Sequence, residues 1–467
     1  MKLIARSLGP IDEAAVELGD LTVFEGPPSS GKSTLMKAIY YSLTWTTPVL
    51  INFTREGEGK LTFKIVLGEG LKGLKEHMSK FIPDGEFRVE PFDVQLFLKE
   101  ARLNVEEKLE VRPRVMFYYG SDCTDSEVDK VNKEGRVEVS YGLQGLSGFV
   151  QYDAHLPQVS QNCEKYVKEV VEGDVEAEVA ERIAGLYEEK YLEELGKHYG
   201  IHDVIFVPFD RASVISAELR KGVEARKEYS LRGYPILSLI GPTLLSLKNV
   251  VGGTPSGSAP YVLSDVAVDY RWKFETAVAS LSYNPKIYRM LAPFLKGEIR
   301  AVGKKLVYTE GDKPISWGHV SASVLEIMGV LLSIREKQLV LIEEPENQLH
   351  ERLKILMALF LYALSASNKV VITTHSQTIS FTLAHLAKTK PTKEEVLKLF
   401  EALGVKGGEV LAEEVERASV SKVKFYYVHD GTAEEMSLEE VSREMPGTSE
   451  VMDKEIDWFN SLYVERG

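Results

Sequence analysis

The chain has 467 residues, 44% of them hydrophobic and 27% charged, which is enough for one large α/β domain with a substantial insertion or for two domains. Its net charge of −14 excludes a protein coated in nucleic acid, because binding along the phosphate backbone depends on lysine and arginine. Nucleic acid in a local groove stays open, and a solvated helix face explains the best candidate cluster equally well. That cluster comprises Arg220, Lys221, Arg226, Lys227 and Arg232.

The two cysteines, Cys123 and Cys163, lie far apart in the sequence and lack metal-ligand spacing. We therefore expect neither a disulfide framework nor a zinc site, which suits a reducing cytoplasm. The longest apolar stretches, around 234–247 and 355–366, are shorter than the ~20 residues that a membrane helix needs. The expected location is the cytoplasm, without a membrane partner.

A glycine-rich loop follows the β-prone run 21–24 and precedes the run 33–43, whose apolar residues have helical spacing. It fits the phosphate-binding pattern G-x-x-x-x-G-K-[ST]. The candidate nucleotide-binding residues are Gly26, Pro27, Pro28, Ser29, Ser30, Gly31, Lys32, Ser33 and Thr34. In such a loop the backbone amides turn onto the phosphates, the lysine reaches the β- and γ-phosphates, and the hydroxyl after it can ligate Mg²⁺. The pattern predicts a nucleoside triphosphate site.

The chain then leaves this motif pattern. Residues 51–67 alternate as in a strand, and the apolar residues from Tyr166 to Leu186 have helical spacing. No heptad persists for more than a few turns, so we expect no long coiled-coil arm. The stretch 251–260 is rich in Gly, Ser and Pro and predicts a loop.

A strand-like run at 206–207 continues into Pro208 and Arg211. Two roles are open for this arginine. As a γ-phosphate sensor it would offset the charge that develops in phosphoryl transfer. Alternatively, it is a structural ion-pair residue.

Ser316 and Gly318 precede a helical run over 321–334. A hydroxyl and amides at a helix start can bind an anion. In isolation, an ordinary N-capping serine beside a glycine would be the better interpretation. The order of motifs along the chain favours the anion site.

The apolar run 338–342 predicts a strand buried on both faces, and it leads directly into Glu343 and Glu344. In an open α/β sheet the carboxyl ends of the strands face the ligand crevice. Glu343 can therefore hold Mg²⁺ through water while Glu344 polarises the attacking water. Acidic residues after a strand are also common in ordinary loops.

A further β-branched run, 369–374, is followed by His375. A neutral imidazole at this sheet edge can hydrogen-bond a γ-phosphate oxygen and sense its presence. The spacing from the paired glutamates fits a strand, a helix and a strand.

In this order, the phosphate loop, Ser-x-Gly, the strand with Glu-Glu-Pro and the strand ending in His resemble the ABC-type ATPases. The segment from Glu343 to His350 is similar to the prokaryotic SMC-like and OLD-like branch, often described as AAA-domain or AbiEii-like. The run from Leu3 to Ile11 resembles the opening hairpin of that branch, and 206–211 resembles its strand ending in Pro-x-x-Arg. The resemblance covers about residues 1–45, 200–215 and 295–380.

The resemblance implies that the phosphate loop binds ATP, that Ser33 and Glu343 serve Mg²⁺, that Glu344 is the catalytic carboxylate and that His375 is the switch histidine. Ser316 and Gly318 would act in trans on ATP held by a second subunit. A chain with one set of motifs then implies a head-to-tail homodimer with two ATP molecules between the subunits.

The sequence departs from the family at three places. Pro28 and Ser29 stand where Asn-Gly is frequent, the acid on the Mg²⁺ side is a glutamate rather than an aspartate, and the signature reads Ser-Trp-Gly-His. These departures affect the expected turnover more than the expected binding. No glutamine-loop residue can be placed.

We therefore expect an α/β fold, a P-loop NTPase of ABC-ATPase type with a mixed central sheet, an antiparallel β lobe and a helical insertion. A discontinuous nucleotide-binding domain would comprise 1–70, 200–215 and 295–467, with inserted β and helical subdomains at 71–199 and 216–294. The expected function is Mg²⁺-dependent ATP hydrolysis by a homodimeric switch in genome maintenance or defence. The alternative is an ATP-regulated scaffold for a toxin or defence partner with negligible turnover.

Overall fold

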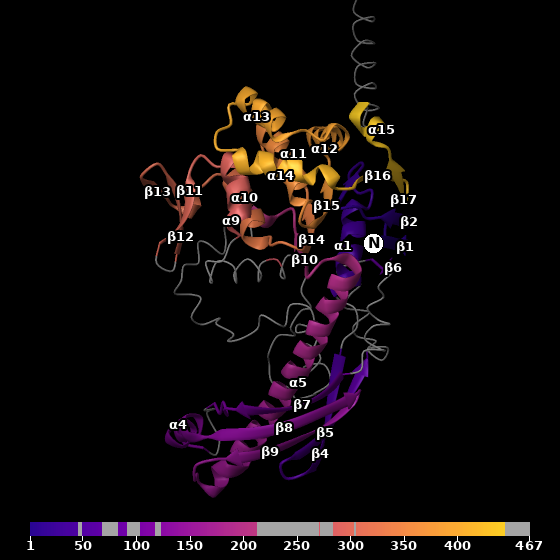
Figure 1. Ribbon diagram of the computed structural model, residues 1–467. Coiled ribbons are helices and arrows are strands. Elements are labelled where there is room, and N and C mark those ends of the chain that lie inside the picture. The colour runs from indigo at the N-terminus through magenta and orange to yellow at the C-terminus, as the bar shows by residue number, and fades with distance from the viewer. Residues whose placement is uncertain are drawn as a thin grey trace, which may run out of the picture.

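Figure 1 shows the computed structural model, which describes residues 1–44, 49–67, 83–90, 103–116, 123–212, 270, 284–302 and 305–443. The molecule has two regions, a main body and a distal region, and a long helix runs between them (Figure 1). The strands of the main body are β1 (Lys2–Leu8), β2 (Ile11–Glu17), β3 (Leu21–Glu25), β6 (Glu86–Glu90), β10 (Asp203–Val207), β11 (Glu298–Val302), β12 (Lys305–Glu310), β13 (Lys313–Ile315), β14 (Gln338–Glu343), β15 (Lys369–Thr374), β16 (Val423–His429) and β17 (Thr432–Met436). Its helices are α1 (Lys32–Thr44), α9 (Pro285–Leu291), α10 (Ala322–Ser333), α11 (Glu351–Leu364), α12 (Gln377–Thr389), α13 (Lys393–Ala402), α14 (Glu409–Arg417) and α15 (Leu438–Arg443), with the 3-10 turns η2 (Ala292–Phe294), η3 (Trp317–His319) and η4 (Ala418–Val420). The distal region contains β4 (Val49–Gly57), β5 (Lys60–Leu67), β7 (Leu103–Val111), β8 (Arg136–Gly145), β9 (Ser147–His155), α4 (Asp125–Glu134) and most of α5 (Gln161–Tyr199).

The centre of the main body is a six-stranded sheet in the order β10-β14-β15-β3-β16-β17. All neighbouring strands are parallel except β16 and β17. Strand β14 is buried along its whole length, as expected for an apolar strand between two layers. Its alternate residues serve two cores: Leu339 and Leu341 pack on the side of α1, and Val340 and Ile342 on the side of α10 and α11.

An antiparallel sheet in the order β2-β1-β6 lies beside α1 on the first of these sides. Its strands β1 and β2 form an antiparallel hairpin at the start of the chain, where the sequence resemblance predicts one. On the other side, α10, α11 and α12 cover the parallel sheet. The predicted fold class, a mixed central sheet with an antiparallel lobe and a helical insertion, is confirmed.

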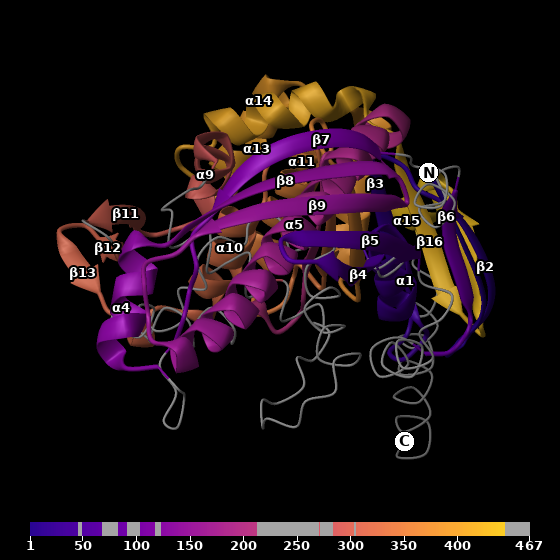
Figure 2. The same ribbon diagram turned by 90° about the horizontal axis from the view of Figure 1, so that it is seen from below.

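The distal region is a five-stranded antiparallel sheet in the order β4-β5-β9-β8-β7, with α5 across one face (Figure 2). Helix α5 has 39 residues and is therefore about 58 Å long. It packs against this sheet along part of its length, and near its other end the Tyr191 hydroxyl donates to the carbonyl of Leu43 at the end of α1.

Strand pairing crosses the domain boundary expected at residue 70 in both directions. Strand β5, expected in the nucleotide-binding domain, pairs with β9 of the distal sheet. Strand β6, expected in the insertion, pairs with β1. These pairings join residues that are distant in sequence, so local patterns could not place the boundary.

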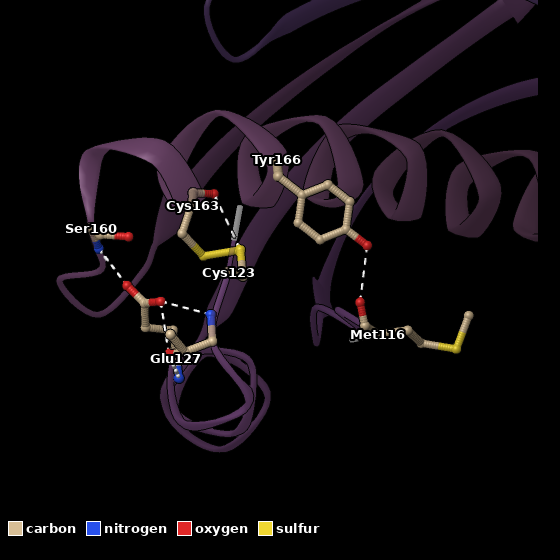
Figure 3. Close-up of a disulfide and its surroundings, with 7 residues drawn as sticks. Met116, Cys123, Glu127, Ser160, Cys163 and Tyr166 are labelled. Carbon is tan, nitrogen blue, oxygen red and sulfur yellow. Dashed lines mark hydrogen bonds between the residues drawn. A yellow bond between two sulfur atoms is a disulfide. The ribbon is translucent and has the colours of Figure 1, made fainter. Parts of the chain in front are cut away.

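Cys123 and Cys163 form a disulfide, so the expectation of unpaired cysteines is wrong (Figure 3). The bond joins the segment before α4 to the first turn of α5. Around it, the N–H of Ser160 donates to a Glu127 carboxylate oxygen over 2.7 Å. The Tyr166 hydroxyl donates to the carbonyl of Met116 over 3.0 Å. The cysteines are 40 residues apart, and only the docking of α4 against α5 reveals the pair. They no longer argue for a reducing compartment.

The basic cluster at 220–232 and the loop at 251–260 lie outside the described residues, as does most of the expected insertion 216–294. Among the residues that are described, no helix combines the length and the apolar character needed to cross a membrane.

Candidate functional site

The phosphate loop joins β3 to α1 at the carboxyl end of the central sheet. Gly26 has φ +149° and Gly31 has φ +104°, values that residues with a Cβ rarely adopt. A Cβ on Gly26 would also come within 2.2 Å of the carbonyl oxygen of Val428. Ser29 stands where the family often has glycine and still adopts φ +61°. A residue with a Cβ in this left-handed region strains the loop backbone.

Lys32 is the first residue of α1 and is only 5% exposed. Its ammonium group donates to the carbonyls of Gly26 over 2.9 Å and Pro27 over 2.7 Å. Burial lowers the pKa of Lys32 to about 8, while Glu344, Glu25 and Glu346 oppose that shift. The loop thus holds a desolvated cation whose present partners are neutral carbonyls, which phosphate oxygens could replace.

Glu343, the last residue of β14, and Ser33 meet at the start of α1. Burial raises the pKa of Glu343, and its hydrogen bond with the Ser33 hydroxyl opposes the rise. Two oxygen donors in contact fit Mg²⁺, which prefers oxygen ligands. No group of three or more His, Cys, Asp or Glu side chains in the described part of the chain could hold a metal ion. Mg²⁺ would therefore need phosphate oxygens as further ligands, as is usual for this ion.

Glu344 and His375 lie close together, although 30 residues stand between them in the sequence. Each follows the carboxyl end of a strand, and the two strands, β14 and β15, are neighbours in the sheet. The register pairs Glu343 with Thr373 and Thr374 with Glu25, so the ends of β14, β15 and β3 are adjacent. The main chain leaves the strand direction at Glu344, which has φ +43°. The carboxylate of Glu344 lies 3.7 Å from Nε2 of His375. Burial lowers the pKa of His375, Lys32 acts in the same direction, and Glu344 opposes the shift. The ring is therefore neutral at pH 7.

Two further carboxylates belong to this edge and were missed in the sequence. Glu346 accepts hydrogen bonds from the Thr374 hydroxyl over 2.7 Å and from the N–H of His375 over 2.9 Å. Glu25, directly before the loop, is 5% exposed, and burial raises its pKa to about 7. Glu346 could have been noticed as the third acid of the Glu-Glu-Pro-Glu motif, and Glu25 as a charge at the end of an apolar strand.

Arg211 is fully buried, and its guanidinium lies 2.5 Å from the carboxylate of Glu326. It also donates to the carbonyls of Glu343 over 2.8 Å and Glu344 over 3.1 Å. The pairing with Glu326 and the full burial of the side chain favour the ion-pair alternative, and the role as a γ-phosphate sensor stays a prediction. Glu326 carried a sequence signal, because it is the only charged residue in the apolar helix α10.

Ser316 and Gly318 lie at η3, and the helix predicted over 321–334 follows them as α10. Ser321 is the N-cap of α10 and accepts from the N–H of Val324. Ser316 is exposed and makes no side-chain capping bond. The role of Ser316 and Gly318 in trans stays a prediction.

Residues 198–380 match the protein family described as "AAA domain, putative AbiEii toxin, Type IV TA system". This segment includes Arg211, Ser316, Glu343, Glu344 and His375. No curated protein matches the sequence significantly.

Solved structures of SMC head domains align with the chain. An SMC head bound to the C-winged helix domain of ScpA has 11% identity and a TM-score of 0.34, over 94% of this chain and 98% of that one. The SMC head domain from Thermotoga maritima has 10% identity and a TM-score of 0.29, over 93% and 97%. An SMC head with an extended coiled coil, bound to the C-terminal domain of ScpA derived from Pyrococcus furiosus, has 9% identity and a TM-score of 0.31, over 97% and 98%.

The assignment depends instead on the family match and on the order in which the sheet presents the motifs. Within the matched segment the carboxylates and His375 stand at the strand ends, and the phosphate loop adjoins them from outside it. Residues 198–380 are thus similar to the AbiEii-like AAA domain, and together with the phosphate loop they indicate a nucleotide-binding P-loop protein.

Proposed function

We propose that the protein hydrolyses ATP with Mg²⁺ and acts as a homodimeric ATP-driven switch. One observation carries the proposal: Glu344 and neutral His375 lie 3.7 Å apart at the strand edge that also holds Lys32. Water, rather than a second substrate, is the acceptor that a carboxylate and an imidazole at this position suit.

Each residue has a defined part in this proposal. Lys32 and the loop amides bind the β- and γ-phosphates, and Ser33 with Glu343 would hold the metal. Mg²⁺, when bound, would offset charge on the phosphate oxygens. Glu344 takes a proton from the water whose oxygen attacks the γ-phosphorus, and the bond from that phosphorus to the β,γ-bridging oxygen breaks. His375 donates to a γ-phosphate oxygen, with Glu346 positioning its backbone.

The substitution Glu344→Gln tests the chemistry, because the amide keeps the shape of the side chain and cannot accept the proton. Phosphate release should fall by about 10²–10⁴-fold, while equilibrium ATP binding stays normal. Glu336→Gln, at the opposite end of β14, is the matched control and should hydrolyse ATP like wild type. Near wild-type turnover in Glu344→Gln would refute this role. ATP binding without turnover in the wild-type protein would favour the regulated scaffold.

The dimer is tested with the same variant. Because Ser316 and Gly318 would reach ATP on a second subunit, Glu344→Gln should elute as a dimer with ATP on size-exclusion chromatography. Adding Ser316→Arg should return it to a monomer while each chain still binds ATP. A monomer in both cases would contradict the dimeric switch. For the cellular setting we propose genome maintenance or defence, and the family description, a putative toxin, supports defence.

A further inference from the structure

Arg211 is a charged side chain with no exposed surface, and the nucleotide chemistry does not use it. It follows β10 and gathers four partners from three elements. Its guanidinium donates to the carbonyls of Pro208 over 3.1 Å, Glu343 over 2.8 Å and Glu344 over 3.1 Å, and lies 2.5 Å from the carboxylate of Glu326 on α10. Burying a charge is unfavourable unless it is paired and hydrogen-bonded. These four partners are therefore what allows the guanidinium of Arg211 to be buried.

Two more hydrogen bonds join the same three elements. The Ser323 hydroxyl of α10 donates to the carbonyl of Gln348 over 2.9 Å. The side-chain amide of Asn347 donates to the carbonyl of Phe209 over 3.0 Å. The turn after β14, residues 344–349, is therefore held both by the segment after β10 and by α10.

This turn needs such support because its backbone is strained. Glu344 has φ +43° and Gln348 has φ +57°, a region that residues other than glycine rarely occupy. Strained residues keep their conformation only where their surroundings enforce it. The φ of Glu344 directs its carboxylate toward His375, so a relaxed turn would move the proposed general base.

We propose that Arg211 is a positioning residue, which with Glu326 fixes the main chain of Glu343 and Glu344 and ties it to α10, the helix that follows the signature loop. Its effect on turnover rests on the proposed function, whereas its effect on the turn does not. The planar fork of arginine can bond two carbonyls and a carboxylate together, and the single ammonium of lysine cannot reproduce that geometry.

The experiment uses the full-length protein with Arg211→Lys and Glu326→Gln, which keep most of the buried volume. The control is Glu414→Gln, because Glu414 is also buried and lies 2.7 Å from Lys286, between α9 and α14 and outside this network. Thermal unfolding reports the stability of each variant. Amide hydrogen exchange of the peptide 343–349, without nucleotide, reports the turn.

In Arg211→Lys the amides of this peptide should exchange roughly fivefold to tenfold faster than in wild type, more than the peptides of β3 and β15, whereas Glu414→Gln should leave the turn unchanged. The value of kcat should fall at least about tenfold with KM little changed, since a 1 Å misplacement can lower a rate ~10²-fold. Glu326→Gln should show the same pattern more weakly.

Wild-type exchange in the turn of Arg211→Lys, or exchange that rises equally in all peptides, would overturn the proposal. So would a kcat that follows only the loss of stability, as in Glu414→Gln. If the wild-type protein releases no phosphate, the proposed function fails, and the exchange result alone still decides the role of Arg211.

Discussion

The main body and the distal region differ in where they place charge. In the main body, Glu25, Lys32, Arg211, Glu326, Glu343 and Glu414 are charged and buried. In the described part of the distal region only Glu172 is. Strand β7 alternates between half-buried and exposed residues up to the buried Val111, and three of its four charged residues, Glu106, Lys108 and Glu110, are exposed. Burying charge is unfavourable, so the main body keeps an arrangement that stability alone would not select.

The comparison of the two regions indicates which buried charged residues serve the nucleotide site. Among the described residues, five of these six buried charges of the main body belong to the phosphate loop, the strand end before it, the paired glutamates or the network that holds them. Glu172 is paired with Arg55, whose Nε lies 2.6 Å from its carboxylate, and that pair joins α5 to β4. We therefore expect substitutions of the buried charges at the nucleotide site to change nucleotide binding or turnover, and substitutions in the distal region to change stability only.

Lys32→Ala has the largest expected effect on nucleotide binding. It removes the buried cation that would meet the β- and γ-phosphates, and charge-assisted bonds of this kind are the strong ones, so Mg·ATP affinity should fall by about 100-fold or more. Equilibrium binding measures it. Lys108→Ala, on the exposed face of β7, is the control and should bind like wild type. Unchanged affinity in Lys32→Ala would refute the assignment of the phosphate loop.

Cys163→Ala tests the distal region. Opening a cross-link between residues 40 apart should destabilise it by about 4 kcal/mol, because the unfolded chain regains conformational freedom. Urea unfolding of the variant, and of wild type with and without a reducing agent, gives this number. ATP affinity should not change in the variant or in the reduced wild-type protein. A loss of affinity on reduction would show that the two regions are coupled more tightly than their charge patterns suggest.

Glu25→Gln has the smallest expected effect and tests the cost of buried charge. Burial, assisted by Glu346, raises the pKa of Glu25 from 4.5 to about 7. The folded state thus binds this proton more tightly than the unfolded state, and the resulting stability is complete below pH 4.5 and lost as the pH rises through about 7. The full change is about 3 kcal/mol.

An amide does not titrate, so the fall in unfolding free energy between pH 5 and pH 8 should be smaller in Glu25→Gln than in wild type by up to that amount. Urea unfolding at the two pH values measures the difference. Parallel pH profiles for the two proteins would contradict the raised pKa.

Much of the fold could be predicted because its signals are local. The phosphate loop needs consecutive residues with particular backbone freedom, and the apolar runs before Glu343 and His375 predict buried strands whatever surrounds them. Once those strands are taken as parallel neighbours, their carboxyl ends must meet at one edge. The roles given to individual residues at this edge remain predictions.

Other features escaped the sequence because they depend on contacts between distant segments. The ion-pair partner of Arg211 became visible only when α10 brought Glu326 to it, 115 positions along the chain. The pairing of Cys123 with Cys163 needed the fold to bring the segment before α4 to the first turn of α5. The sequence of neither strand shows that β5 pairs with β9 in the distal region or that β6 pairs with β1 in the main body.

The sequence by itself therefore determined the phosphate loop, the apolar strands of the parallel sheet and the order in which their polar ends follow one another. Only the tertiary structure decided which buried charges are paired, which cysteines are joined and where the distal region begins. The physical reason is range. Backbone conformation and hydrophobic periodicity act over a few residues, whereas the energy of a charge or a thiol in the interior depends on the partner that folding brings to it.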